Sequence, residues 1–591
     1  MNEPKGAQQK TERQANQVNA HNWQQAYKTW LAHSNVDADT RSELKAIQGK
    51  EKEIRDRFDG DLDFGTGGLR GIIGAGTRRM NRYVVRKATQ GFANYLVKQY
   101  GEVDEKKVAI AYDSRRYSRE FAEDTALALA GNGIKALLFQ DMRPLPELSF
   151  AVREKDCLGG VVITASHNPP RYNGYKIYGR DGGQAVPSLA GQVTEEIRKL
   201  DIFEDVKHIS REEALNQGLL EYLGEEMDRL YLDRIKSLTF LTGDGELRVV
   251  YSALHGTGIR MVPRALEELG YSSVFVQEEQ AEADPDFSTV KVPNPEDPDA
   301  FALSLKLAEE KDADLILATD PDADRVGCAV KNSRGTYTLL NGNQVGALLV
   351  NYLLSRLQEQ GRLPSNGVIL KTVVTGNLGK KIAASYGIET LETLTGFKYI
   401  GEKIKEFEQS GEYTFLFGYE ESYGYLAGTY SRDKDAVLTS ILIVEMASYY
   451  KKTGKNLLEV LEGLLQKHGY FLEELESIEL ENMSLAAEIL EGFKVRGFTE
   501  IDGIRVVEKR DYESRKAINL LTGEYRPIEL PQSEVIYFLL EDESWFCIRP
   551  SGTEPKIKFY FSITAENEKQ AREKMDTVKK AVLERTKQGE Q

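Results

Sequence analysis

Cysteine is scarce in this sequence, since its 591 residues include only three. Cys157, Cys328 and Cys547 lie far apart, and none of them belongs to a CxxC pair. This spacing excludes a zinc ribbon and argues against a disulfide framework. A reducing compartment suits such a chain, so we predict a cytoplasmic protein.

Long apolar runs and an excess of positive charge are also missing. No run of about 18 apolar residues occurs, and the N-terminal stretch MNEPKGAQQKTERQANQVNA lacks the apolar region of a signal peptide. The net charge is -16, whereas nonspecific nucleic-acid binding needs Lys and Arg to displace counterions from phosphates. We therefore expect neither a membrane nor a nucleic-acid partner, and the sequence gives no indication of the oligomeric state.

The chain is long and has the composition of a globular protein. At about 150 residues per domain, its length predicts roughly four domains. Hydrophobic residues make up 41% of the chain, which is enough for a core in each domain. We predict a disordered extension over residues 1–20. The expected domains that follow are residues 21–217, 218–340, 341–470 and 471–591.

A pattern of apolar strands alternating with segments of helical length occurs three times. The expected strands are 108–115, 135–141 and 159–166, then 247–256, 272–277 and 313–320, then 367–376, 388–393 and 413–422. Such a pattern predicts three similar α/β units whose mixed sheets are mainly parallel. After residue 470 the pattern changes to that of a smaller α+β domain with antiparallel strands.

The third strand of each unit runs into a polar loop, and the three loops are TASHNP, DPDADR and GYEES. Ligands of parallel sheets collect at the carboxyl ends of strands. The loops are therefore the first candidates for a functional site.

DPDADR places Asp320, Asp322 and Asp324 two residues apart. Three carboxylates so close together repel one another unless a cation neutralises them, and oxygen ligands suit a hard ion such as Mg²⁺. An EF-hand is excluded because Arg325 stands where its glycine is required and Lys331 where its glutamate is required. The alternative is a solvated acidic turn.

TASHNP places Ser166 at the end of a buried strand. Its neighbours Ala165 and His167 do not form the GxSxG sequence of a hydrolase nucleophile. Ser166 could instead cap a helix, although Pro169 and Pro170 make a helix start less natural. A histidine such as His167, taken alone, is more often structural than catalytic.

Three further loops carry polar groups. RPSGTEPKIK offers hydroxyls, backbone amides, Arg549 and Lys558 as a cradle for phosphate, or is an ordinary polar hairpin. FGTGGLRG misses dinucleotide spacing, and its glycines either let Arg70 approach a ligand or form a simple turn. The acceptors of YEES and the following Lys434 suit sugar hydroxyls, or form a charged loop.

In this order, FGTGGLRG, TASHNP, DPDADR, TLTGFKYI, YEES and RPSGTEPK resemble the motifs of the α-D-phosphohexomutase superfamily. The chain most resembles bacterial phosphoglucomutases of the longer type. The likeness extends from about residue 45 to residue 575, and one departure is Tyr419, where many of these proteins have glycine. The resemblance implies four domains around a central cleft.

The resemblance also implies roles for residues. Ser166 would be a phosphoserine nucleophile, and Asp320, Asp322 and Asp324 would bind Mg²⁺ with an oxygen of the phosphate on Ser166 as a further ligand. Proton transfer would fall to His167 or Lys176, with Lys434 as a second candidate. The other implied residues are Arg70 and Arg325 near the reacting phosphate, Thr395, Gly396, Glu420 and Ser422 at the sugar, and Arg549, Ser551, Gly552, Thr553 and Lys558 at the other phosphate.

The implied activity is that of a phosphoglucomutase, an isomerase that interconverts glucose 1-phosphate and glucose 6-phosphate through glucose 1,6-bisphosphate. That bisphosphate would serve as intermediate and activator. Phosphomannomutase and phosphopentomutase activity by the same mechanism are alternatives. A silent sugar-phosphate sensor is a third, but it would need neither the serine nor all three aspartates.

Overall fold

The computed structural model describes residues 22–65, 67–243, 246–551 and 556–587, and the extension predicted over residues 1–20 lies outside them. The described chain forms two compact units. The first unit runs to Asp228 and includes the segment Ala283–Pro293, and the second contains Arg229–Glu282 and the chain from Asn294 onward. The boundary therefore falls within helix α10 (Glu225–Lys236).

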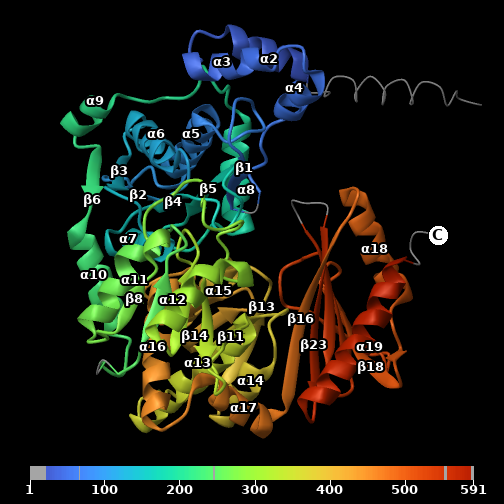
Figure 1. Ribbon diagram of the computed structural model, residues 1–591. Coiled ribbons are helices and arrows are strands. Elements are labelled where there is room, and N and C mark those ends of the chain that lie inside the picture. The colour runs from blue at the N-terminus through green and yellow to red at the C-terminus, as the bar shows by residue number, and fades with distance from the viewer. Residues whose placement is uncertain (1–21, 66, 244–245, 552–555, 588–591) are drawn as a thin grey trace, which may run out of the picture. The chain divides into compact units, whose positions relative to one another are not determined.

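A six-stranded mixed sheet forms the core of the first unit (Figure 1). Its strands are β1 (Gly68–Ile72), β2 (Lys107–Tyr112), β3 (Lys135–Phe139), β4 (Gly159–Ile163), β5 (Tyr172–Tyr178) and β6 (Leu220–Leu223). The order is β1-β5-β4-β2-β3-β6, in which the last four strands are parallel and β5 and β1 are antiparallel additions at one edge.

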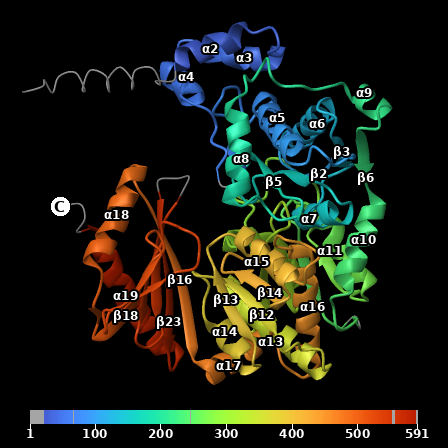
Figure 2. The same ribbon diagram turned by 180° about the vertical axis from the view of Figure 1, so that it is seen from behind.

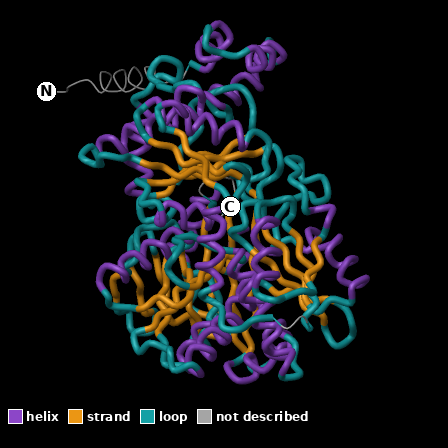
Figure 3. Tube along the Cα trace, turned by 90° about the vertical axis from the view of Figure 1, so that its left-hand side faces the viewer, coloured by secondary structure: helices purple, strands orange, loops and turns teal. Residues whose placement is uncertain are grey.

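Helices cover both faces of this sheet. They are α5 (Arg82–Gln99), α6 (Ser118–Gly131), α7 (Leu145–Glu154), α8 (Pro187–Arg198) and the short α9 (Arg211–Asn216). Helices α5 and α6 lie on one side of the strands and α7 on the other (Figures 1 and 2), and Figure 3 shows helices on both sides of the strands. Because both faces are covered, the central strands are apolar throughout, as in β4, whose five residues are all buried.

The N-terminal helices add a small aromatic core to the first unit. They are α2 (Trp23–Ala32), α3 (Ala38–Ala46) and α4 (Glu51–Phe58). Trp30 meets Phe58 and Tyr83 edge to face, with ring centroids 5.8 and 5.3 Å apart. Helix α3 begins where Asp37 accepts a hydrogen bond from the backbone amide of Thr40.

The second unit contains a five-stranded and a four-stranded α/β sheet. The elements of the first of these are β7 (Val249–Ser252), α11 (Gly258–Glu268), β8 (Val274–Val276), η1 (Glu278–Gln280), η2 (Pro298–Phe301), α12 (Ala302–Lys311), β9 (Leu315–Thr319), β10 (Val326–Lys331) and β11 (Tyr337–Leu340). Those of the second are α13 (Gly342–Glu359), β12 (Gly367–Thr372), α14 (Leu378–Ser385), β13 (Glu389–Thr393), α15 (Phe397–Ser410), β14 (Thr414–Glu420), β15 (Gly424–Ala427), α16 (Ala436–Lys452) and α17 (Leu457–His468). The strand orders are β11-β10-β9-β7-β8 and β13-β12-β14-β15.

The last part of the second unit is an eight-stranded sheet whose pairings are all antiparallel. Its elements are β16 (Tyr470–Glu479), α18 (Met483–Arg496), β17 (Glu500–Ile501), β18 (Ile504–Asp511), β19 (Lys516–Asn519), β20 (Tyr525–Pro527), β21 (Ile536–Leu540), β22 (Trp545–Pro550), β23 (Lys556–Ala565) and α19 (Glu568–Lys587). Helices α18 and α19 pack on one face (Figure 2). On the other, Tyr537, Cys547 and Tyr560 pack with Val373 and Val374.

The predicted fold class is confirmed, since three α/β sheets precede an antiparallel domain. The sequence did not indicate β5, β10 and β15, and these antiparallel strands make each α/β sheet mixed. The three cysteines are buried and free. None of the described helices combines the length and the apolar character that a membrane crossing requires.

Candidate functional site

The three polar loops occupy equivalent places in the three α/β sheets. Each joins the third predicted strand to an antiparallel neighbour, namely β4 to β5, β9 to β10 and β14 to β15. Each loop also holds one non-glycine residue in the left-handed region, with φ of 51° at Ser166, 52° at Ala323 and 65° at Tyr423. Such backbone conformations concentrate at functional sites, where the surrounding structure stabilises them.

Ser166 lies at the carboxyl end of β4 and is only 9% exposed. Its backbone amide donates to Thr164 Oγ1 at 2.8 Å, and its Oγ lies 3.1 Å from His167 Nδ1. No helix starts at this point, which removes the helix-cap interpretation. The serine oxygen therefore has an imidazole within proton-transfer distance.

Arg70 and Lys176 come from the strands beside this loop. Arg70 on β1 pairs in register with Gly174 on β5, and its Nη1 donates to Asn168 Oδ1 at 3.3 Å. Lys176 on β5 pairs with Val162 of β4. A Cβ at Gly68 would lie 2.1 Å from a backbone oxygen of β5, so this glycine permits the close β1–β5 pairing that places Arg70.

The carboxylates of Asp320, Asp322 and Asp324 form the predicted cluster between β9 and β10. All three are buried, and one oxygen of each lies within 4.8 Å of the others. Burial, and then the charges of Asp322 and Asp324, raise the pKa of Asp320 well above its usual range. Three buried carboxylates this close together are a set of oxygen ligands that fits a hard divalent cation. The solvated-turn alternative is wrong.

Two cations flank this cluster. Lys434 Nζ lies 3.0 Å from Asp324 Oδ2 and 3.1 Å from Asp433 Oδ1. Burial opposes the charge on Lys434, but these aspartates hold its pKa above the usual range. Arg325 donates to Glu296, a carboxylate that sequence reasoning missed because it lies 24 residues before the aspartates of its own loop.

Glu420 ends strand β14 and is 5% exposed. Its carboxylate accepts a hydrogen bond of 2.9 Å from the backbone amide of Gly396. Gly396 has a φ of 116° and precedes the first turn of α15, so a side chain would be strained there. Burial raises the pKa of Glu420 to about 7, although Lys434 acts to lower it. The TLTG and YEES loops are thus joined.

Three other residues of these loops differ in where they lie. Ser422 and Thr395 are half-buried. Ser422 follows Glu420 by two residues in the chain, and Thr395 immediately precedes Gly396. Tyr419 is 1% exposed, and Cβ atoms at Gly346 and Gly379 would lie 2.3 Å from it. The tyrosine that departs from the family pattern therefore fills the core between α13, α14 and β14.

Arg549 and Lys558 are brought together by the hairpin of β22 and β23. The two residues are directly paired across the strands, and the amide of Ser551 donates to the oxygen of Lys556 at 2.8 Å. Gly552 and Thr553, which complete the predicted phosphate cradle, lie outside the described residues. Burial lowers the pKa of Lys558, while Glu296 acts to raise it.

Lys398 is a further cation at this end of the second unit, which sequence reasoning missed. It follows Gly396 on the first turn of α15 and is 8% exposed. Burial, and then the charge of Arg549, lower its pKa to about 8. Electrostatic coupling also joins Arg325 to Glu420 and to Lys558. Arg325, which follows Asp324 in the chain, is therefore coupled to groups of the sugar loop and of the β22–β23 hairpin.

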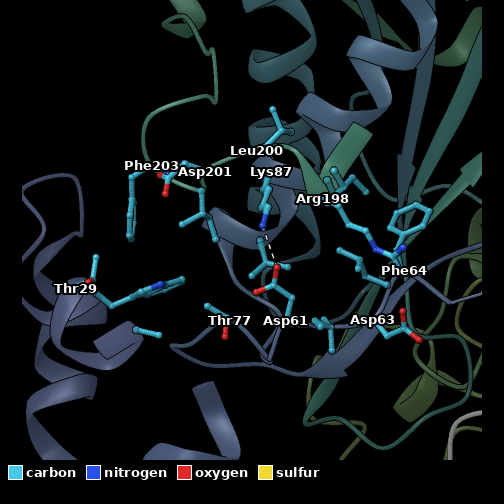
Figure 4. Close-up of a pocket in the computed structure, with 18 of the residues that line it drawn as sticks. Thr29, Asp61, Asp63, Phe64, Thr77, Lys87, Arg198, Leu200, Asp201 and Phe203 are labelled. Carbon is cyan, nitrogen blue, oxygen red and sulfur yellow. Dashed lines mark hydrogen bonds and ion pairs between the residues drawn. The ribbon is translucent and has the colours of Figure 1, made fainter. Parts of the chain in front are cut away.

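A separate pocket of about 770 Å³ lies in the first unit beside the N-terminal helices (Figure 4). It is lined by Trp30, Phe64 and Phe203 among others, and the lining includes the Lys87–Asp61 ion pair of 3.0 Å. None of the predicted site residues that the structure describes lines it. The pocket is therefore described apart from the candidate site.

Four family models match the chain in sequence order. They describe domains I, II and III (α/β/α) and the C-terminal domain of phosphoglucomutase/phosphomannomutase, and match residues 61–202, 229–335, 341–468 and 494–580. The chain belongs to the phosphoglucomutase/phosphomannomutase family. Each of the four matched regions of this family contains one of the loops TASHNP, DPDADR, YEES and RPSGTEPK. The N-terminal helices over residues 22–60 precede the first matched region.

Curated relatives from this family are similar over most of their length. The phosphoglucomutase of Staphylococcus saprophyticus is 36% identical over 520 residues, which is 88% of this chain and 93% of that protein. The phosphoglucomutase of Staphylococcus epidermidis (strain RP62A) is 38% identical over 523 residues, or 87% of this chain and 93% of that protein.

Solved structures share the fold of this family. The open form of the Paramecium phosphoglucomutase parafusin has a TM-score of 0.68 at 18% identity and covers 89% of this chain and 95% of its own. A family protein from Burkholderia thailandensis has a TM-score of 0.64 at 19% identity and covers 89% and 97%. These likenesses support the four-domain arrangement of secondary structure.

Proposed function

We propose that this chain is a phosphoglucomutase that interconverts glucose 1-phosphate and glucose 6-phosphate through a phosphoserine at Ser166. The observation that carries the proposal is the presence of both Ser166 and the buried aspartate cluster in a chain 36% identical to a phosphoglucomutase over 88% of its length. A serine for covalent transfer and a cation site are the two parts that phosphoryl transfer needs.

In the proposed reaction the phosphate on Ser166 moves to the free hydroxyl of the sugar phosphate. The bond between Ser166 Oγ and phosphorus breaks as the sugar oxygen bonds to phosphorus, and the hydroxyl proton passes to a base. The bisphosphate then reverses its orientation in the site, and Ser166 Oγ takes the other phosphoryl group. His167, Lys176 and Lys434 are the candidates for moving the proton, and Arg70 and Arg325 would offset charge on the phosphoryl oxygens.

Asp320, Asp322 and Asp324 would hold Mg²⁺, and we propose that an oxygen of the phosphate on Ser166 completes its ligands. When bound, the ion offsets negative charge on the phosphoryl group. By holding the ion, the aspartates would reduce the repulsion between their own negative charge and that of the phosphate.

The sugar and the second phosphate would be held by the other loops. Glu420 and Ser422 would accept sugar hydroxyls beside Thr395 and Gly396. Arg549, Ser551, Gly552, Thr553 and Lys558 would hold the phosphate that does not react. Lys398, whose pKa is lowered by burial and by the charge of Arg549, would join them.

The preference for glucose is tested by comparing kcat/KM for glucose, mannose and ribose 1-phosphates. We expect the highest value for glucose 1-phosphate. A higher value for the mannose or ribose substrate would make the chain a phosphomannomutase or phosphopentomutase, and binding without turnover would make it a sensor. Hexose phosphate is the proposed partner, and the cytoplasmic location stays a prediction from the cysteine pattern.

The raised pKa of Glu420 predicts that kcat/KM decreases on the acid side of its pH profile. When ionised, the Glu420 carboxylate would accept from sugar hydroxyls through both oxygens, whereas protonation makes one oxygen a donor, and burial raises its pKa to about 7. Activity is therefore lost as the pH falls below that value, with kcat/KM decreasing about tenfold per pH unit. Glu420→Gln should be less active and should lose this limb, keeping only the limb of the substrate phosphate near a pH of about 6.

The control for Glu420 is Glu389→Gln, an exposed glutamate on β13 of the same sheet. Its pH profile should match that of the wild type. An unchanged acid limb in Glu420→Gln would contradict the assignment of the limb to this carboxylate.

Replacement of Arg549 is predicted to lower kcat and to raise KM. If its guanidinium grips the distal phosphate, Arg549→Ala should lower kcat/KM by roughly ten- to a hundredfold, because a charge-assisted bond contributes about 1.5 to 3 kcal/mol. Ser166 should still carry phosphate. Steady-state kinetics would check this against Arg505→Ala, an arginine of the same sheet that is 60% exposed. Equal kinetics in the two variants would leave the hairpin without a role.

A further inference from the structure

Arg115 is a buried cation beside the Ser166 loop that the proposed reaction does not use. It follows β2 in the segment Asp113–Ser114–Arg115, and β2 lies next to β4 in the sheet. Arg115 is 3% exposed, and its Nε lies 3.3 Å from Asp113 Oδ2. A buried charge needs such a partner. Asp113 in turn accepts from Ser118 Oγ at 2.6 Å and from the amide of Arg115 at 3.0 Å.

The two terminal nitrogens of Arg115 donate to backbone oxygens of one loop. Nη2 donates to the carbonyls of Ser166 and Asn168. Nη1 donates to the carbonyls of Pro169 and Tyr172, both at 3.1 Å. One planar guanidinium therefore ties together four carbonyls over seven residues, from the serine to the first residue of β5.

The face of the guanidinium is covered as well. Phe287 is fully buried, and its ring centroid lies 4.9 Å from Arg115 Cζ. This phenylalanine belongs to the segment Ala283–Pro293 of the first unit. The neighbouring Arg116 binds Asp286 of that segment through Nη2, at 2.7 and 2.9 Å. The guanidinium is thus enclosed at its edges by acceptors and on one face by an aromatic ring.

We propose that Arg115 is a positioning residue that holds the Ser166 loop in the geometry needed for phosphoryl transfer; the inference rests on the proposed function. Ser166 has a φ of 51°, which few residues other than glycine adopt without support. Arg115 binds the carbonyl of that same residue and those of Asn168, Pro169 and Tyr172. It thereby fixes where the serine oxygen points without touching the substrate.

Lysine cannot take the place of Arg115 in these contacts. An ammonium group keeps the charge opposite Asp113 but lacks the planar fork that reaches four carbonyls in fixed directions. Arg115→Lys should therefore fold and remain ion-paired while its loop relaxes. Since a displacement of about 1 Å in a reacting group can lower a rate by about a hundredfold, the variant should lose kcat.

The test compares full-length wild type, Arg115→Lys, Arg115→Ala and the control Arg116→Lys. We expect kcat of Arg115→Lys to fall by at least about tenfold while KM changes by less than about threefold, because ground-state binding is unaffected. Added guanidinium should restore part of the activity of Arg115→Ala and none of that of Arg115→Lys. Amide exchange should rise over residues 164–172 and stay unchanged in the sheet.

Arg116→Lys should keep its activity within about twofold, since its side chain is 52% exposed and an exposed ion pair contributes little. Wild-type kcat in both Arg115 variants would overturn the inference. So would failure of both variants to fold, or a loss of activity that follows the folded fraction and does not respond to guanidinium. A wild type that neither carries phosphate on Ser166 nor turns over would instead refute the proposed function.

Discussion

Ser166→Ala is expected to abolish mutase activity while the protein stays folded. The substitution removes the oxygen that would carry the phosphoryl group, so activity should fall by at least about a thousandfold. The fold should persist, because Ser166 lies in a loop at a strand end and its loss opens no core cavity. Coupled assay of glucose 6-phosphate formation and thermal unfolding would measure the two quantities.

The matched control is Ser188→Ala, an exposed serine at the start of α8 in the same unit. It should retain full activity. If a clean preparation of Ser166→Ala kept more than a few per cent of wild-type turnover, Ser166 would not be the phosphoryl carrier.

Removal of the metal is expected to stop turnover, and Mg²⁺ should restore it. The carboxylates of Asp320, Asp322 and Asp324 are buried within 4.8 Å of one another, and without a cation their repulsion is only partly offset by Lys434. Asp322→Asn should therefore lower the affinity for Mg²⁺ and the activity together. Mg²⁺ should also raise the Tm of the wild type, by an amount that grows with its concentration, and should raise that of Asp322→Asn less.

Asp312→Asn is the control for the metal prediction. Asp312 is the C-cap of α12, a helix that contacts β9 just before the aspartate loop, but its side chain is 72% exposed and pairs with Lys331. This variant should keep the metal response of the wild type. Full activity of the wild type in exhaustively chelated buffer would contradict the metal assignment.

Strands that are buried on both faces could be predicted from the sequence. The segments containing β2, β4, β9 and β14 are apolar, β-branched and bounded by polar loops, so their place and their functional ends follow from the pattern. Strand β5 could not be predicted in the same way. Its sequence YNGYKIY has no continuous apolar run and follows two prolines, and its pairing with β4 and β1 makes it a strand.

Site residues that belong to a sequence motif could be predicted from the sequence. Site residues whose role depends on contacts with distant parts of the chain could not. Asp320 and Ser166 belong to the motifs DPDADR and TASHNP, whose residue types indicate metal binding and, by family resemblance, phosphoryl transfer. Lys398 and Arg115 are ordinary basic residues in the sequence, and their roles depend on burial beside Arg549 and beside the carbonyls of a loop 51 residues further on. No local pattern reports such contacts. The left-handed conformation of Ser166 is likewise visible only in the structure.

The most direct test of the account is the intact mass of the full-length protein before and after contact with substrate. After incubation with glucose 1,6-bisphosphate, the wild type should gain the mass of one phosphoryl group, and peptide mapping should place it on Ser166. A molar excess of glucose 1-phosphate should then remove it, with the phosphoryl group recovered in the bisphosphate. An active enzyme that carries no phosphate on Ser166, or carries one that the sugar phosphate does not remove, would contradict the account.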